Sequence, residues 1–194
     1  MQKTRKSFST EKMVTIAVII ALISALQAFS SVAARIGLFS FALGLFPATV
    51  GSVMYGKKES IIFGSVLGIV ILATDATAYA LYSVNFLATV LVVLAKSIAS
   101  TFVTALIFQL LKRYNRYVAI VVAAILSPVI NPGIFIGGVC IFFKDFFAQF
   151  ISGEVFIIGF ILMLLTNFII ETIINVVLSP VVLRVIDVKK PNRF

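Results

Sequence analysis

One long apolar run with a lysine near its middle limits what this chain can fold into. The run extends from Asn85 to Leu111 and reads NFLATVLVVLAKSIASTFVTALIFQLL, with Lys96 as its only charged residue. Crossing the hydrocarbon core of a bilayer takes about 20 apolar residues, so the run is long enough to span it. At about 1.5 Å of rise per residue, Lys96 lies on the order of 15 Å from either end. An ammonium group at that depth costs about 2.5 to 3.5 kcal/mol, which other parts of the protein must compensate.

The rest of the sequence is similarly apolar. Hydrophobic residues make up 61% of the 194 residues, charged residues make up 12%, and the mean hydropathy is +1.18. A soluble domain of this size could not bury so much apolar surface. The runs are long and lack the alternation of barrel strands, so the predicted fold class is all-α. We predict one integral membrane domain over residues 1–194, a bundle of six transmembrane helices at roughly 13–34, 39–55, 61–74, 86–111, 118–143 and 156–186.

Two of these spans depart from a plain apolar helix. The 61–74 span is only marginally long enough, and TDATAYALYS, which follows it, is predicted to be a polar and aromatic loop. The 118–143 span is predicted to be interrupted at SPVINPGIFIGG, because Pro128 and Pro132 lack the N–H groups that would bond the carbonyls of Ala124 and Pro128. Freed carbonyls in a membrane accompany either a simple kink or a cavity.

The basic residues test this topology. If the N-terminus is cytoplasmic, the inner segments hold 13 of the 16 Lys and Arg residues, and the outer segments hold only Arg35 and Lys144. The remaining one is Lys96. This imbalance satisfies the positive-inside rule for an even number of spans with both termini in the cytoplasm. The net charge of +9 therefore reflects topology and not nucleic-acid binding. A cleavable signal peptide is the alternative interpretation of the N-terminus, although the run from Met13 to Ala34 is longer than is usual for one.

Several functional classes lack their usual residues. The chain has no His and a single cysteine, Cys140, so an internal disulfide is impossible and no metal site or cofactor is expected. Cys140 lies in an apolar run and is predicted to be a small buried residue. No P-loop is present, so uphill transport would require a partner that supplies the energy.

Polar residues of three spans fall at one depth. Counted from the outer ends of their helices, Asn131 and Asn167 lie near the level of Lys96. Glu171 and Asn175 follow Asn167 at intervals of four, so these three share one face, which we expect to point into the bundle. In one interpretation Lys96 pairs with Glu171 and the asparagines hold helices together. In the other, the layer lines an outward-open site where Lys96 meets a carboxylate or phosphate.

The loop predicted after residue 74 adds four candidates. Asp75, Tyr79, Tyr82 and Asn85 either belong to an aromatic belt at the membrane interface or form a lid over the site. The complete set of candidate substrate-binding residues is Lys96, Asn131, Asn167, Glu171, Asp75, Tyr79, Tyr82 and Asn85.

The first span carries a ladder of small residues. Ala17, Ala21 and Ala25 are spaced by four, so they share one face on which another helix can approach closely. This face packs either inside the bundle or against a partner membrane protein.

These features together resemble the substrate-binding S components of energy-coupling factor (ECF) vitamin transporters, along essentially the whole chain. The resemblance rests on the length, the six spans, the alanine ladder and two segments. These segments are LFPATVGSVMYGKKESIIFGSVLGIV, from Leu45 to Val70, and SPVINPGIFIGG, from Ser127 to Gly138. The resemblance implies a multi-pass protein of a prokaryotic cell membrane that captures a vitamin from outside and has no ATPase or other enzymatic activity of its own.

The resemblance also implies partners and a substrate class. Ala17, Ala21 and Ala25 would contact a shared transmembrane coupling subunit driven by two cytoplasmic ATPases. Pantothenate is the expected vitamin, since Lys96 suits a carboxylate, and riboflavin or a B6 vitamer is the alternative. Outside this family, the alternatives are a channel or a small membrane enzyme, whose chemistry would have to depend on Asp75, Lys96 and Glu171.

Overall fold

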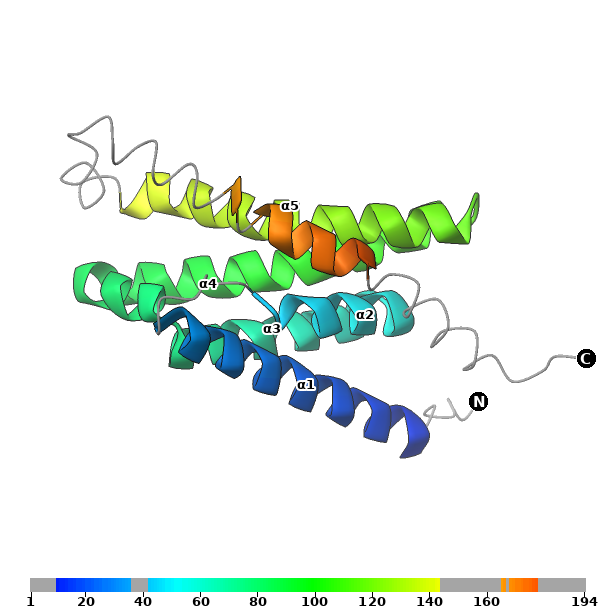
Figure 1. Ribbon diagram of the computed structural model, residues 1–194, viewed down its shortest axis with the longest axis horizontal. Helices are drawn as coiled ribbons and strands as arrows, with labels where there is room; N and C mark the ends of the chain where they lie inside the picture. The colour runs from blue at the N-terminus through cyan, green and yellow to red at the C-terminus, as the bar shows by residue number, and fades with distance from the viewer. Residues whose placement is uncertain (1–9, 36–41, 144–164, 167, 178–194) are drawn as a thin grey trace, which may run out of the picture.

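The computed structural model describes residues 10–35, 42–143, 165–166 and 168–177. These residues form helices that pack side by side in a single bundle (Figure 1). No strand occurs in this part of the chain, so the all-α prediction is confirmed for it. The helices are α1 (Thr10–Arg35), α2 (Leu45–Tyr55), α3 (Lys57–Thr74), α4 (Ala76–Leu111) and α5 (Arg116–Phe142), followed by a helical segment at 168–177, here called the 168–177 helix.

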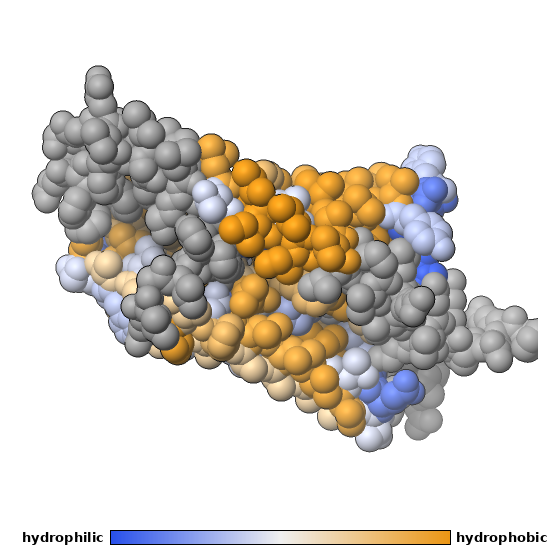
Figure 2. Space-filling view, viewed as in Figure 1, coloured by the Kyte–Doolittle hydropathy of each residue, from blue (hydrophilic) through white to orange (hydrophobic). Residues whose placement is uncertain are grey.

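The bundle has the surface of a membrane protein. Three helices of the described part of the chain are long and apolar enough to cross a membrane, namely α1 up to Ala34, α4 and α5. Large apolar side chains such as Leu22, Leu91 and Ile141 are exposed on the outside. Figure 2 shows this apolar surface over the middle of the molecule and hydrophilic residues at one end. That end, here called the basic end, is where α1 and α5 begin and where the α2–α3 and α4–α5 turns lie, and it carries Lys12, Lys57, Lys58, Lys112, Arg113 and Arg116.

Three predictions about helix boundaries were wrong. The span predicted at 39–55 is not helical at residues 42–44, so α2 begins at Leu45 and has 11 residues. The predicted loop after residue 74 is helical, so α4 begins at Ala76 and not at residue 86. The predicted interruption of the fifth span is absent, since α5 continues through Pro128 and Pro132 to Phe142. Prolines are tolerated in membrane helices because neighbouring groups compensate the lost backbone bonds. Of the sixth predicted span, 156–186, only residues 165–166 and 168–177 are described, and these are helical.

Side-chain caps determine where α4 begins and bends. Asp75 precedes its first turn and accepts a hydrogen bond from the Thr77 N–H at 2.7 Å. Asn85 has non-helical dihedral angles, φ −156° and ψ 99°, so α4 is kinked there. The Asn85 Oδ1 then accepts from the Ala88 N–H at 3.0 Å, as an N-cap of the second half does. Two capped helices therefore meet at Asn85, and the longer one carries Lys96.

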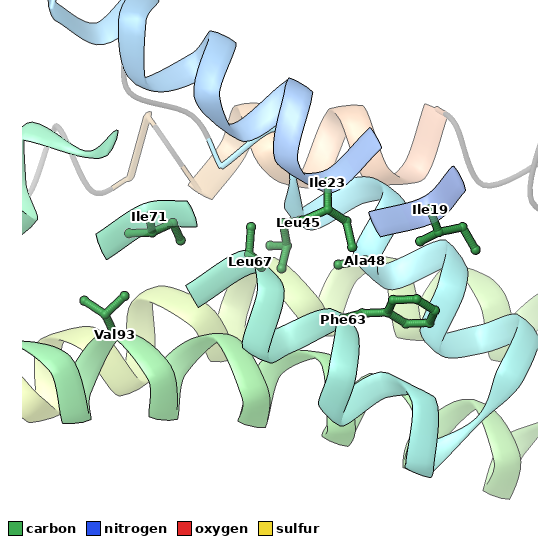
Figure 3. Close-up of a cluster of buried hydrophobic side chains, with 8 residues drawn as sticks. All are labelled: Ile19, Ile23, Leu45, Ala48, Phe63, Leu67, Ile71 and Val93. Atoms are coloured by element: carbon green, nitrogen blue, oxygen red, sulfur yellow. The ribbon is translucent and has the colours of Figure 1, made fainter. Parts of the chain in front are cut away.

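A close approach of α3 and α4 positions the polar face of α4. A Cβ atom added at Gly64 would lie 2.4 Å from Thr101 Oγ1 and 2.6 Å from the Ile98 Cα, so only glycine fits. A Cβ atom added at Gly68, four residues later, would lie 2.9 Å from the Cδ2 of Leu94 and 3.4 Å from its Cα. Small residues at this spacing are typical of tightly packed membrane helices. The main apolar core lies beside this contact and is shown in Figure 3, with Ile19, Ile23, Leu45, Ala48, Phe63, Leu67, Ile71 and Val93.

Candidate functional site

Contacts between α4 and α5 bring Lys96 and Asn131 to one level. The Lys96 ammonium lies 4.6 Å from the centre of the Phe135 ring, and the Ser100 hydroxyl donates to the Ser127 carbonyl at 2.9 Å. The two helices are antiparallel, so the stretch from Lys96 to Ser100 faces the stretch from Phe135 to Ser127. Asn131 lies midway along that stretch of α5, on the same face as both its neighbours four residues away.

Lys96 has no direct carboxylate partner among the described residues. It forms no ion pair or hydrogen bond with any residue that the structure describes, although both Asp75 and Glu171 are described. Among the described residues, its contact is the ring face of Phe135. A cation over an aromatic ring gains about 0.5 to 2 kcal/mol. The ring is not a conventional hydrogen-bond acceptor, so the three N–H donors of the ammonium group stay available. The ion pair between Lys96 and Glu171 that one interpretation of the sequence required is therefore not formed.

The two carboxylates are instead bonded to backbone. Glu171 Oε1 accepts from the Ala42 N–H at 2.8 Å, which ties the 168–177 helix to the segment ahead of α2. Asp75 caps α4 through its bond from the Thr77 N–H. Each carboxylate thus has a structural partner, whereas the cation has none among the described residues.

Asn131 supplies a second unused polar group at this level. The residue is only 5% exposed, and its Oδ1 has no hydrogen-bond partner among the described residues. Leaving a buried acceptor unpaired costs about 1 to 3 kcal/mol. Lys96 and Asn131 therefore offer, on neighbouring helices, unused donors with a positive charge and an unused neutral acceptor.

The candidates around the α3–α4 corner have structural contacts. Tyr79 donates its hydroxyl to the Ala73 carbonyl, and Tyr82 donates to the Leu72 carbonyl at 2.9 Å, which caps the end of α3. The Tyr79 and Tyr82 rings meet edge to face, with their centres 5.9 Å apart. Asn85 is exposed and caps the second half of α4. These residues form the end of the bundle opposite the basic end, whereas Asn167 lies outside the described residues.

Sequence reasoning missed a cluster of buried hydroxyl groups that lies next to the level of Lys96 and Asn131, on the side of the basic end. Thr49 Oγ1 and Ser127 Oγ lie 2.9 Å apart, and Ser100 Oγ lies 3.2 Å from Ser127 Oγ. All three residues are at most 5% exposed. The signal was present in the apolar run of α4, where SIAST places small hydroxyl residues at helical spacing, but hydropathy alone does not show which helix they face.

The predicted docking face of α1 is on the outside. Ala17, Ala21 and Ala25 are exposed, while Ile19 and Ile23 on the opposite side are buried in the core. The alanines therefore do not pack inside the described bundle.

Two further observations limit the chemistry. Cys140 is exposed, so its predicted burial was wrong, because it lies on the outward side of α5. Within the described ranges, no group of His, Cys, Asp and Glu residues could hold a metal ion.

Comparisons with family models, curated proteins and solved structures give no match to this chain.

Proposed function

We propose that this chain is the substrate-binding S component of an ECF-type importer and captures a small anionic vitamin inside a six-helix membrane bundle. The observation that carries the proposal is the ammonium of Lys96, which has no ion pair or hydrogen bond among the described residues and lies deep in an apolar helix against Phe135. Burying a charge without a partner is costly, so such a residue in a membrane is retained for a ligand or an ion path.

The surrounding groups indicate the ligand class. A molecule bound here has to supply an anionic acceptor for Lys96 and an N–H or O–H donor for the Asn131 oxygen. Pantothenate has a carboxylate, an amide N–H and two hydroxyls, so it satisfies both demands. Riboflavin or a B6 vitamer would use Asn131 but would leave Lys96 without a carboxylate. We therefore propose pantothenate as the substrate.

The remaining features support a partner-driven importer. The exposed alanine face of α1 is the proposed contact with a transmembrane coupling subunit, and two cytoplasmic ATPases would supply the energy. The basic end would face the cytoplasm, with both termini on that side of a prokaryotic cell membrane.

The first experiment is a binding measurement with a matched pair of ligands. Native mass spectrometry of the purified protein, followed by denaturation, identifies any vitamin that co-purifies. Titration then compares pantothenate with panthenol, which replaces the carboxylate by a neutral hydroxymethyl group. We expect Lys96→Met to weaken pantothenate binding by about 100-fold, within the range for losing one partner of a buried charge pair, and to leave panthenol binding nearly unchanged.

Lys112→Met is the matched control. The Lys112 ammonium also lies over a ring, 5.9 Å from the centre of Phe108, but Lys112 is at the basic end. We therefore expect its replacement to leave the affinities for pantothenate and panthenol unchanged. Equal losses for pantothenate and panthenol in Lys96→Met would show that Lys96 is not the counter-ion of the ligand. No saturable binding of any vitamin by the folded protein would contradict the proposed function.

A further inference from the structure

A small cleft lies on the basic side of the hydroxyl cluster. It is lined by α2, α5 and the 168–177 helix, and its walls are apolar except for Thr49 and Asn175. Asn175 is only 3% exposed, and its Oδ1 has no hydrogen-bond partner among the described residues, although its Nδ2 donates to the Glu171 carbonyl. The residues that line the cleft are Phe46, Thr49, Val50, Val53, Ile120, Ala124 and Asn175.

One face of α5 connects this cleft with the site at Lys96. Ala124, Ser127, Asn131 and Phe135 follow one another at intervals of three or four residues, so they share that face. Ala124 lines the cleft, Asn131 and Phe135 belong to the outer level, and Ser127 lies between them. The Thr49–Ser127–Ser100 cluster therefore separates two places, each with a buried amide oxygen that has no hydrogen-bond partner among the described residues.

We propose that the cleft is a second, inner contact site for the ligand, reached when the hydroxyl cluster separates, and that Asn175 there accepts an N–H or O–H group of the ligand. The inference rests on the proposed function, since it needs a ligand that enters at Lys96. The cluster is suited to the role because hydroxyl bonds are individually weak, about 0.5 to 1.5 kcal/mol net. Serine and threonine can also exchange partners with a ligand that carries donors and acceptors of its own.

Cysteine accessibility tests the connection without any ligand. In a Cys140→Ser background, Asn131→Cys reports on the outer level and Ala124→Cys on the cleft. The probe is 2-aminoethyl methanethiosulfonate, added to the outside of intact cells. Any reagent that crosses the membrane is consumed by the reducing cytosol, so modification reports access from outside. We expect Asn131→Cys to be modified and Ala124→Cys to react at least ten times more slowly. With Thr49→Val and Ser127→Ala added, Ala124→Cys should react at least ten times faster than before.

The matched control removes two equivalent hydroxyls outside the cluster. Thr104→Val and Ser52→Ala delete buried groups that bond to carbonyls of their own helices, and they should leave Ala124→Cys slow to react. An unchanged rate for Ala124→Cys in the Thr49→Val, Ser127→Ala protein would overturn the inner site. The inner site would also be overturned if Ala124→Cys reacted as fast as Asn131→Cys in the Cys140→Ser background, with Thr49 and Ser127 unchanged. Failure of Asn131→Cys to react from outside would instead contradict the outward-open site of the proposed function.

The role of Asn175 has a separate readout in stability. Replacing a residue that is needed for folding lowers the stability of the protein. Replacing an unpaired polar group that is kept for a ligand raises it, because the unpaired group itself destabilises the fold. Asn175→Leu removes the unpaired oxygen and fills the cleft, so we expect the unfolding temperature in detergent to rise by a few degrees. A fall in the unfolding temperature would assign Asn175 a structural role and overturn its part in the inner site.

Discussion

At the residue scale, polar side chains of this bundle divide into those with internal partners and those without. Asp75, Glu171, Tyr82 and Asn85 each bond to backbone and thereby hold helix ends in place. Lys96, by contrast, has only the Phe135 ring as a partner in the part of the chain that the structure describes. Burial of polar groups is tolerated when they are paired, so the unpaired ones are the better candidates for ligand contact. This separates two groups of residues that the sequence alone placed in one site.

Asn85 allows a test of that division. Asn85→Ala removes the cap of the second half of α4, and we expect it to lower the free energy of unfolding by about 0.5 to 2 kcal/mol. The dissociation constant of pantothenate for the folded protein should stay within about twofold, less than about 0.5 kcal/mol. Thermal unfolding and ligand titration measure the two quantities. Asn85→Asp, which keeps the capping oxygen, serves as the control. Weaker ligand binding at unchanged stability would place Asn85 in the binding site after all.

At the scale of the elements, hydropathy predicted the long helices well and their interruptions poorly. α1, α4 and α5 were predictable because apolar runs of that length have few alternatives in a membrane. The segment after Thr74 was misread as a loop because its Asp, Thr and Tyr residues are polar, although an Asp ahead of an alanine-rich stretch is also a helix-start signal. α5 is continuous through Pro128 and Pro132 and packs against α4, and the sequence of α5 alone does not show which helix will pack against it.

The candidate site was predictable only in part for the same reason. The depth of Lys96 and Asn131 follows from counting residues along a helix, and the structure does place them at one level. Partners depend on helix rotation and on which helices are neighbours. Glu171 was therefore expected at Lys96 but bonds to Ala42, and Thr49 was not recognised as a partner of Ser127.

The contact between α3 and α4 makes a prediction about glycine. In Gly64→Ala the new methyl group would meet Thr101, Ile98 and the Ser97 carbonyl at 2.4 to 2.7 Å, so the helices must move apart. We expect a loss of about 1 to 3 kcal/mol, the usual cost of overpacking. Gly133→Ala on α5 is the matched control, because nothing lies within 4 Å of the added atom. Removing a helical glycine there should be neutral or stabilising by up to about 1 kcal/mol. Equal unfolding temperatures for the two variants would show that α3 and α4 are not tightly packed at Gly64.

At the scale of the whole molecule, the outer surface of α1 allows the proposed ligand binding and the proposed transport to be tested separately. Its inward side is fixed by Ile19 and Ile23 in the core, while Ala21 and Ala25 lie on the exposed side. A leucine at either alanine therefore does not disturb the described core or the site at Lys96. The same leucine would prevent a partner helix from approaching to backbone contact, since close membrane-helix packing needs small residues.

We therefore expect Ala21→Leu and Ala25→Leu to abolish vitamin uptake by the assembled importer while the purified subunit keeps its affinity for pantothenate. Ala95→Leu is the matched control, because Ala95 is also an exposed alanine within a membrane span but lies on α4. Uptake of labelled vitamin into cells, together with titration of the purified variants, measures both properties. Loss of uptake in all three variants would show that any added bulk on the surface is harmful. Loss of binding together with uptake in Ala21→Leu would mean that this face contributes to the folded bundle itself, and the partner would then have to dock elsewhere.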